Sequence, residues 1–226
     1  MEINDLLRRE KARRDTYKSL AECYYLPDGD LIIKLKGLER QLGVLGSGAL
    51  SYAALMRSEL QGPKELKKLA IDFARLFVGP YSLPAPPYGS VYLEGERKIM
   101  GDSTLDVQER YRRAGVELSD NFRDVPDHIA AELEFMYFLI FKEIQALENS
   151  DVDTAIDYLE KQRAFLREHL GAWVFDFADS IEENAETDFY KNLARATKAF
   201  IEQNFDELSD LSAPESRSDP SMSVAN

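Results

Sequence analysis

The sequence contains one cysteine, one tryptophan and two histidines among its 226 residues. A single cysteine excludes an internal disulfide and a cysteine-based zinc site, and it favours a reducing compartment. Apolar runs fall short of the roughly 18 residues that a membrane-spanning helix needs. The N-terminal stretch MEINDLLRREKARRD is charged throughout and has no apolar core. We therefore expect no secretory signal, no membrane insertion and a cytoplasmic location.

Motifs of several enzyme classes are also missing. The sequence has no phosphate-binding G-x-x-x-x-G-K-[ST], no H-E-x-x-H and no G-x-S-x-G. A di-iron bundle places glutamate three residues before its histidines, but Val125 precedes His128 and Leu166 precedes His169 at that distance. We expect no catalytic residues, no metal site and no cofactor, and hence a protein that is not an enzyme.

Cys23 stands beside two tyrosines on an apolar segment. This setting predicts a buried structural thiol, because free cysteine behaves as a small hydrophobic residue. The spacing leaves open a second interpretation, in which Cys23 pairs with His128 as a nucleophile.

The formal net charge is −13, from 41 acidic and 28 basic side chains. Such a surface repels nucleic acid and anionic membranes, so a basic partner fits better. Residues 171–226 carry 12 acidic and 4 basic side chains, a net charge of −8. A solvated helix face with an acidic tail explains this bias, and attraction of a cationic peptide is the alternative.

Apolar residues recur with helical spacing along most of the chain, and no alternating strand pattern or repeat is present. Helices are predicted over 5–26, 30–42, 49–60, 63–78, 104–114, 126–148, 151–170, 172–183 and 187–205. The helix 126–148 is the most apolar, so we expect it to be central and buried on most sides. The sequence predicts an all-α fold: a single compact bundle of about seven to nine helices over residues 1–205. Residues 206–226 hold six serines, five acids and two prolines and are expected to be a disordered tail.

The stretch GPYSLPAPPYGSVY (79–92) interrupts this helical pattern with four of the nine prolines of the chain. Its remaining side chains are largely apolar or aromatic, whereas loops are usually polar. Two interpretations are open: a stiff wall for a ligand, or a rigid crossover packed on the bundle. The following segment YLEGERKIM is expected to be extended with a turn at Gly95, and Ser103 with Asp106 is expected to cap the next helix.

Asp127 and His128 form a polar pair that follows Pro126, in the expected first turn of the central helix. There Asp127 complements the helix dipole, and His128 is expected to hydrogen-bond Glu132 one turn on. Adjacent helical residues point in different directions, so the pair is not a catalytic dyad by itself.

Two stretches resemble a known family. DFARLFVGPYSLPAPPYGSVYLEGERKIMGDSTL (72–105) and VPDHIAAELEFM (125–136) are similar to the TorD/DmsD/NarJ-type redox-enzyme maturation chaperones, with the DmsD branch nearest. The resemblance implies an all-α cytoplasmic chaperone that binds the twin-arginine signal peptide of a molybdopterin oxidoreductase catalytic subunit. It would hold the apo-subunit during cofactor insertion and prevent premature export. A monomer is implied, with domain-swapped dimers among relatives.

The resemblance also implies a set of peptide-binding residues. They are Phe73, Leu76, Phe77, Pro87, Tyr88, Pro126, Asp127 and His128, with Tyr24 as a weaker member. The first three are expected to form a groove floor and the loop a wall, since an apolar groove with acids at one end suits a basic, apolar leader. Acids expected at the rim are Asp127, Glu132, Glu94 and Asp102. The alternative function is a helical scaffold or assembly protein of a redox complex that acts through its acidic tail.

Overall fold

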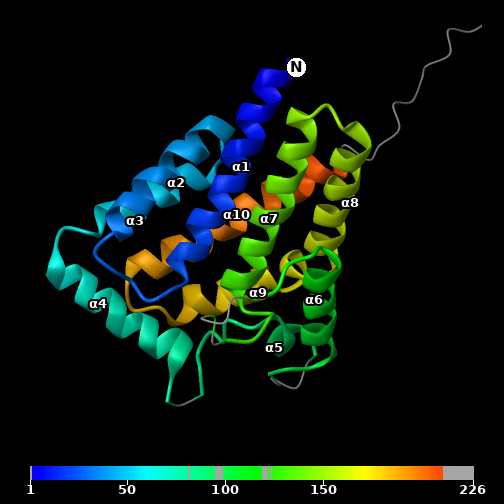
Figure 1. The fold of residues 1–226 in the computed structure, drawn as a ribbon. Coiled ribbons are helices and arrows are strands. Elements are labelled where there is room, and N and C mark those ends of the chain that lie inside the picture. Colours follow the sequence, from blue (N-terminus) through cyan, green and yellow to red (C-terminus); the bar gives the residue numbers. More distant parts are fainter. Residues whose placement is uncertain (1, 81, 95–98, 119–121, 123, 211–226) are drawn as a thin grey trace, which may run out of the picture.

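The computed structural model describes residues 2–80, 82–94, 99–118, 122 and 124–210 (Figure 1). Within these ranges the chain forms ten α-helices and one π-helical turn, η1. Their bounds are α1 (Ile3–Cys23), α2 (Leu31–Leu45), α3 (Ala49–Ser58), α4 (Pro63–Phe73), η1 (Ala74–Val78), α5 (Gly89–Leu93), α6 (Asp102–Arg113), α7 (Ile129–Glu148), α8 (Val152–Glu168), α9 (Leu170–Asn184) and α10 (Asp188–Asp210). The all-α prediction is confirmed.

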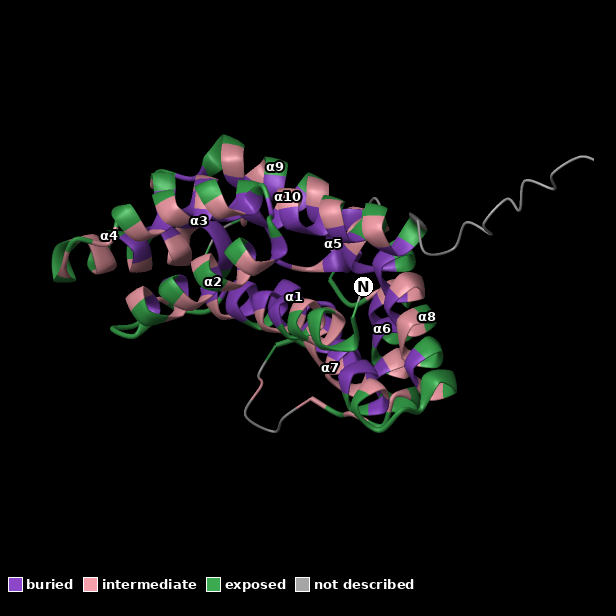
Figure 2. Cartoon of the chain, turned by 90° about the horizontal axis from the view of Figure 1, so that it is seen from above, coloured by how far each residue is buried: buried purple, intermediate pink, exposed green. Residues whose placement is uncertain are grey.

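The helices pack in two layers. α1 and α7 lie side by side in one layer with α2, and α10 lies behind them with α3 and α9 (Figure 1). α8 packs on α7, and α5 links α6 to α9. Helix α4 lies at the edge of the molecule (Figures 1 and 2). None of the helices in the described part of the chain is long and apolar enough to cross a lipid bilayer.

The core lies between these layers, and the buried residues gather where helices face one another (Figure 2). The predicted stripe of α7 is buried: Ile129, Leu133, Met136 and Ile140 are 0% exposed. Tyr17 of α1 packs edge-on against Phe200 of α10 with ring centroids 4.9 Å apart. The apolar period of α7 therefore identifies its buried face from sequence alone.

Asp72 in α4 ties the edge helix to the last helix. Its side chain is buried and accepts hydrogen bonds from the backbone N–H groups of Glu186 (3.0 Å) and Thr187 (2.8 Å), just before α10. The Thr187 hydroxyl donates to the same carboxylate at 2.8 Å, and Arg75 donates to its other oxygen at 2.8 Å. A carboxylate satisfies the unpaired amides at a helix start and complements its dipole. Asp72 is thus a cap supplied from more than a hundred residues away.

The helix that begins at Pro63 continues as the π-helical turn η1 and stops at Gly79. Gly79 has a φ of 95°, in the left-handed region that favours glycine. The predicted stop at Gly79-Pro80 is therefore confirmed, and the proline loop starts from a residue suited to reversing the chain.

Three local expectations are wrong. Residues 89–93 form the short helix α5, which makes ten helices where seven to nine were expected. Ser103 lies inside α6, and its N–H and hydroxyl donate to Glu94 at 2.9 and 2.6 Å, so the cap comes from the preceding segment. Helix α10 extends past residue 205 to Asp210, because Leu208 is buried. The expected turn at Gly95 and the tail beyond residue 210 lie outside the described residues.

Candidate functional site

The end of the proline loop is bonded to the start of α7. Gly89 N–H donates to the Asp127 carbonyl, and Ile129 N–H donates to the Pro87 carbonyl, both at 2.9 Å. Together they make an isolated antiparallel bridge between Tyr88 and His128. We call residues 87–90 and 126–129 the motif junction. Both sequence motifs that carry the family resemblance meet in it.

Asp127 is a buried residue that holds this junction together through a hydrogen bond. Only 1% of the residue is exposed, and its Oδ2 accepts a hydrogen bond of 2.7 Å from the Ser90 N–H in α5. The expected position in the first turn of α7 is wrong, because α7 starts at Ile129. The carboxylate does meet a helix start, but it is that of α5. Its burial also removes it from the rim, where an incoming arginine would need it.

His128 is the N-cap of α7. Its Nδ1 accepts a hydrogen bond of 3.1 Å from the Ala130 N–H, so the expected bond to Glu132 is wrong. The ring packs edge-on against Tyr88, with centroids 5.6 Å apart, and Nε2 lies 3.9 Å from Asp124. Burial lowers the pKa of His128, although Asp124 and Asp127 oppose that shift. A neutral ring suits the cap, because Nδ1 must keep its lone pair.

Glu132 lies behind the junction and is fully buried. Its Oε2 accepts a hydrogen bond of 3.0 Å from the indole of Trp173. Burial raises the pKa of Glu132 well above its usual range, the indole opposes this, and the Asp127 charge adds to it. Gly89 lies so close that a Cβ there would be 3.0 Å from Trp173 Nε1 and 3.2 Å from Glu132 Oε1. Because Gly89 has no side chain, the loop can pack directly against Trp173 and Glu132. Glu132 therefore does not lie at the rim of a groove, where it was expected.

The predicted groove floor lies mostly inside the protein. Leu76 and Phe77 are 0% and 5% exposed, and Phe73 at the end of α4 is half-buried. Phe77 packs against Tyr190 and Tyr24, with ring centroids 5.6 and 6.2 Å apart. We call Tyr24, Phe73, Phe77 and Tyr190 the inner aromatic cluster.

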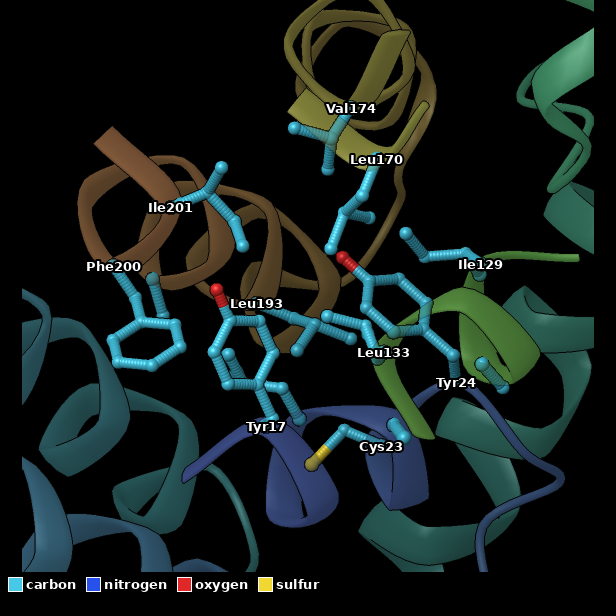
Figure 3. Packing of buried hydrophobic residues seen from close by; sticks show 14 of the residues in the cluster. Tyr17, Cys23, Tyr24, Ile129, Leu133, Leu170, Val174, Leu193, Phe200 and Ile201 are labelled. Atoms are coloured by element: carbon cyan, nitrogen blue, oxygen red, sulfur yellow. The ribbon is translucent and has the colours of Figure 1, made fainter. Parts of the chain in front are cut away.

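Tyr24 itself is enclosed by the core. Its ring lies among Ile129, Leu133 and Leu170 (Figure 3), and its hydroxyl is 3.0 Å from Thr197 Oγ1. Tyr24 therefore has a packing role. Of the predicted peptide-binding residues, Tyr88, Pro126 and Phe73 are partly exposed.

An open groove of about 490 Å³ runs beside the first turns of α7. Its lining residues are Tyr25, Tyr111, Val116, Glu117, Leu118, Phe122, Ala131, Glu134, Phe135 and Phe138. We call it the α7 groove. A second groove of about 440 Å³ shares residues 116–118 and Tyr111 with it and extends along α6. The α7 groove contains none of the nine predicted peptide-binding residues.

The α7 groove nevertheless touches the motif junction through two contacts. Tyr111 donates a hydrogen bond of 3.0 Å to the Pro126 carbonyl, and Phe122 packs edge-on against His128 at 6.1 Å. The junction therefore forms one end of the wall behind the groove.

Sequence reasoning missed the α7 groove for a definable reason. The apolar composition of residues 126–148 predicts a helix buried on most sides, but Phe138 on α7 is only half-buried. Two aromatic rings one turn apart beside an exposed Glu134 are a local signal of a partly open face. The approach of Tyr25, Tyr111 and Phe122 depends on three separate segments, and no local pattern encodes it.

Potential catalytic groups are few in the described residues. Cys23 is buried, as predicted, and burial raises the pKa of its thiol to about 12, which opposes a nucleophilic thiolate. No group of three or more His, Cys, Asp or Glu side chains in the described ranges could hold a metal ion.

A family model described as the nitrate reductase delta subunit matches residues 45–179. The chain is 30% identical over 191 residues to a candidate Tat proofreading chaperone, DmsD, of Haemophilus influenzae, covering 81% of this chain and 84% of that protein. It is 29% identical over 148 residues to the chaperone protein TorD of Vibrio parahaemolyticus, covering 65% and 66%. Identity to the Tat proofreading chaperone DmsD of Salmonella typhimurium is 31% over 129 residues, covering 57% and 56%.

The matched stretches of the last two relatives thus span less than two thirds of those proteins. All three are named as chaperones. Among solved structures, a candidate redox enzyme maturation protein from Archaeoglobus fulgidus superposes with a TM-score of 0.51 at 22% identity, covering 84% of this chain and 93% of that one. This last similarity supports the shared all-α fold.

Proposed function

Because the chain belongs to the nitrate reductase delta subunit family, we propose that it is a cytoplasmic chaperone that binds the twin-arginine signal peptide of a redox enzyme. The client is the apo catalytic subunit of a molybdopterin oxidoreductase, which the protein holds until its cofactor is inserted, and it acts as a monomer. The names of the relatives support the chaperone role. Binding delays export, because a covered signal peptide is not presented to the translocation machinery.

The observation that carries the proposal is the rigid motif junction beside an open aromatic groove. The loop is fixed by two backbone hydrogen bonds and by Asp127 before any peptide arrives. A flexible loop would lose about 1 kcal/mol of conformational entropy per ordered residue on binding. Pre-ordering the loop removes most of that loss, so more of the contact free energy remains as affinity.

The expected affinity follows from the surface that the peptide buries. Burial of about 400 Å² of apolar peptide surface favours binding by roughly 10 kcal/mol. Ordering the peptide opposes this by a few kcal/mol, which leaves about 7–8 kcal/mol and a micromolar dissociation constant. Such an affinity permits later release of the client.

Calorimetric titration with a synthetic twin-arginine leader tests the proposal. Micromolar or tighter binding is expected, and Tyr88→Ala, which removes a half-buried ring from the junction, should weaken it. Tyr158→Ala is a matched control, because Tyr158 is also half-buried but lies on α8. Absence of leader binding by the wild-type protein would refute the chaperone assignment. An unaffected Tyr88 variant would refute the predicted site alone.

Truncation of the acidic tail distinguishes the alternative scaffold function from the chaperone function. The cut belongs after Asp210, because Leu208 is buried and its carbonyl accepts a hydrogen bond of 2.7 Å from Arg163. Under the chaperone proposal the shortened protein binds the leader as well as the full chain does. Loss of client capture with leader binding intact would favour the scaffold.

A further inference from the structure

The walls of the α7 groove are aromatic. Phe135 and Phe138 stack with ring centroids 6.3 Å apart, and Tyr111 lies 4.5 Å from Phe135. Rings have few rotatable bonds, so they offer apolar contact area at a low entropic cost. The groove volume, about 490 Å³, falls within the roughly 300–1,000 Å³ of ordinary ligand sites. This surface suits the apolar side chains of a peptide.

The end of the groove at Tyr25 is negative. The Tyr25 hydroxyl donates a hydrogen bond of 3.1 Å to Glu134 Oε1. Burial raises the pKa of Tyr25, and the charges of Glu134, Asp124 and Glu22 raise it further. Burial raises the pKa of Glu134, the Tyr25 hydrogen bond and the Lys18 ammonium group lower it, and the Glu22 charge raises it. Glu134, Asp124 and Glu22 thus act on Tyr25 with the same sign, and Lys18 acts on Glu134 with the opposite sign, so negative charge prevails at this end of the groove.

Glu134 differs from Asp127 and Glu132 because it is exposed. Tyr25 donates a hydrogen bond to Oε1, and Oε2 accepts none from the described residues, so it is available to a guanidinium group. A planar guanidinium binds a carboxylate through parallel N–H donors, with more geometric selectivity than an ammonium group.

We propose that the α7 groove binds the apolar stretch of the client peptide and that Glu134 pairs with an arginine preceding that stretch. This inference rests on the proposed function and names the surface that performs it. Apolar side chains lie against the half-buried Phe138, whose ring stacks on the buried Phe135, and the arginine lies at the Tyr25 end. The motif junction then supports the wall of the groove through Tyr111 and Phe122 and does not itself pair with arginine.

The arginine contact is tested by a cycle of protein and peptide changes. Leaders carrying the arginine pair, or glutamines in its place, are titrated into the wild-type protein and into Glu134→Gln. The variant should bind the arginine leader about fivefold more weakly, the value of an ion pair near 1 kcal/mol, and the glutamine leader equally well. Glu202→Gln on α10 is the charge-matched control and should change neither. Equal effects of Glu134→Gln on both leaders, or no effect on either, would overturn the pairing.

The apolar contact needs a separate variant. Phe138→Ala should weaken both leaders about tenfold, equivalent to about 1.4 kcal/mol. Phe175→Ala, at another half-buried ring on α9, should leave binding unchanged, and the circular dichroism melting curves of both variants establish that they fold. If Phe138→Ala binds normally while Tyr88→Ala does not, the peptide lies at the junction and this inference fails while the proposed function stands.

A second copy of the chain is the competing occupant of the groove. A wild-type dimer in sedimentation equilibrium that dissociates in Phe138→Ala, with leader binding unchanged, would assign the groove to that copy and overturn the proposal. Failure of the wild-type protein to bind any leader would instead remove the proposed function itself.

Discussion

The acids in and just before the first turns of α7 are held in opposite ways on the inward and outward sides. On the inward side Asp127 and Glu132 are buried, and each accepts a hydrogen bond from a fixed donor, Ser90 N–H or the Trp173 indole. On the outward side Glu134 is exposed and bonded only to the Tyr25 hydroxyl among the described residues. The difference teaches that acids of one motif divide by burial: Asp127 and Glu132 organise the inside of the wall, while Glu134 stays accessible from outside.

Replacement of Asp127 should have the largest effect on stability. Asp127→Ala leaves the Ser90 amide buried without an acceptor, which costs about 2 kcal/mol. Asp127→Asn keeps an acceptor oxygen and should lose about half of that. Urea unfolding measures both free energies. Equal losses in the two variants would show that charge, not the hydrogen bond, holds the inward side together.

Gly89 tests how closely the loop must approach the core. Gly89→Ala places a Cβ 3.0 Å from Trp173 Nε1 and 3.2 Å from Glu132 Oε1, so one of these side chains must shift. A loss of about 1–2 kcal/mol in the free energy of unfolding is expected from overpacking. A red shift in the emission of Trp173, the only tryptophan of the chain, should accompany it. Unchanged stability and emission would contradict a tight fit.

Glu132 should make stability depend on pH. Its pKa in the folded protein is raised by burial, so its contribution is complete below the ordinary glutamate pKa of about 4.3 and declines as the pH rises through the folded value. Unfolding free energies of the wild-type protein and Glu132→Gln should therefore diverge between acid and neutral pH, with the wild-type protein losing more. Parallel pH profiles would show that Glu132 is ionised in the folded protein.

Glu134 should have the smallest effect on stability. Its exposed side chain makes one hydrogen bond to a half-exposed tyrosine, so Glu134→Gln should change the free energy of unfolding by less than about 0.5 kcal/mol. The same urea experiment measures this difference. A loss as large as that of Asp127→Ala would erase the contrast between the two sides of α7.

Sequence alone predicts the parts of this molecule that follow from local chemistry. The 3.6-residue period of α7 gives its buried face, and Gly79 with Pro80 gives the end of η1. Helix α5 escaped prediction because five residues are too few to show a period, and it is stabilised by Asp127 from another segment. The end of α10 escaped because the acid- and serine-rich composition after residue 205 hides the buried Leu208.

The candidate site divides in the same way. The family motifs identify the junction residues, but burial decides which of them can meet a partner, and burial depends on the whole fold. Asp127 and Tyr24 look like binding residues in the sequence and lie inside the protein. Tyr25 and Phe135 are not among the predicted binding residues, and only the packing of α1 against α7 brings them to one open groove.

The cap that Asp72 gives to α10 has a consequence for biosynthesis. The amides it satisfies belong to Glu186 and Thr187, and Tyr17 and Tyr24 likewise find their core partners on α10. During translation the first three helices emerge long before the residues that complete their packing, and contacts so distant along the chain form slowly. This part of the core cannot close until α10 leaves the ribosome, so a protein proposed to hold an apo-subunit passes through an exposed stage of its own.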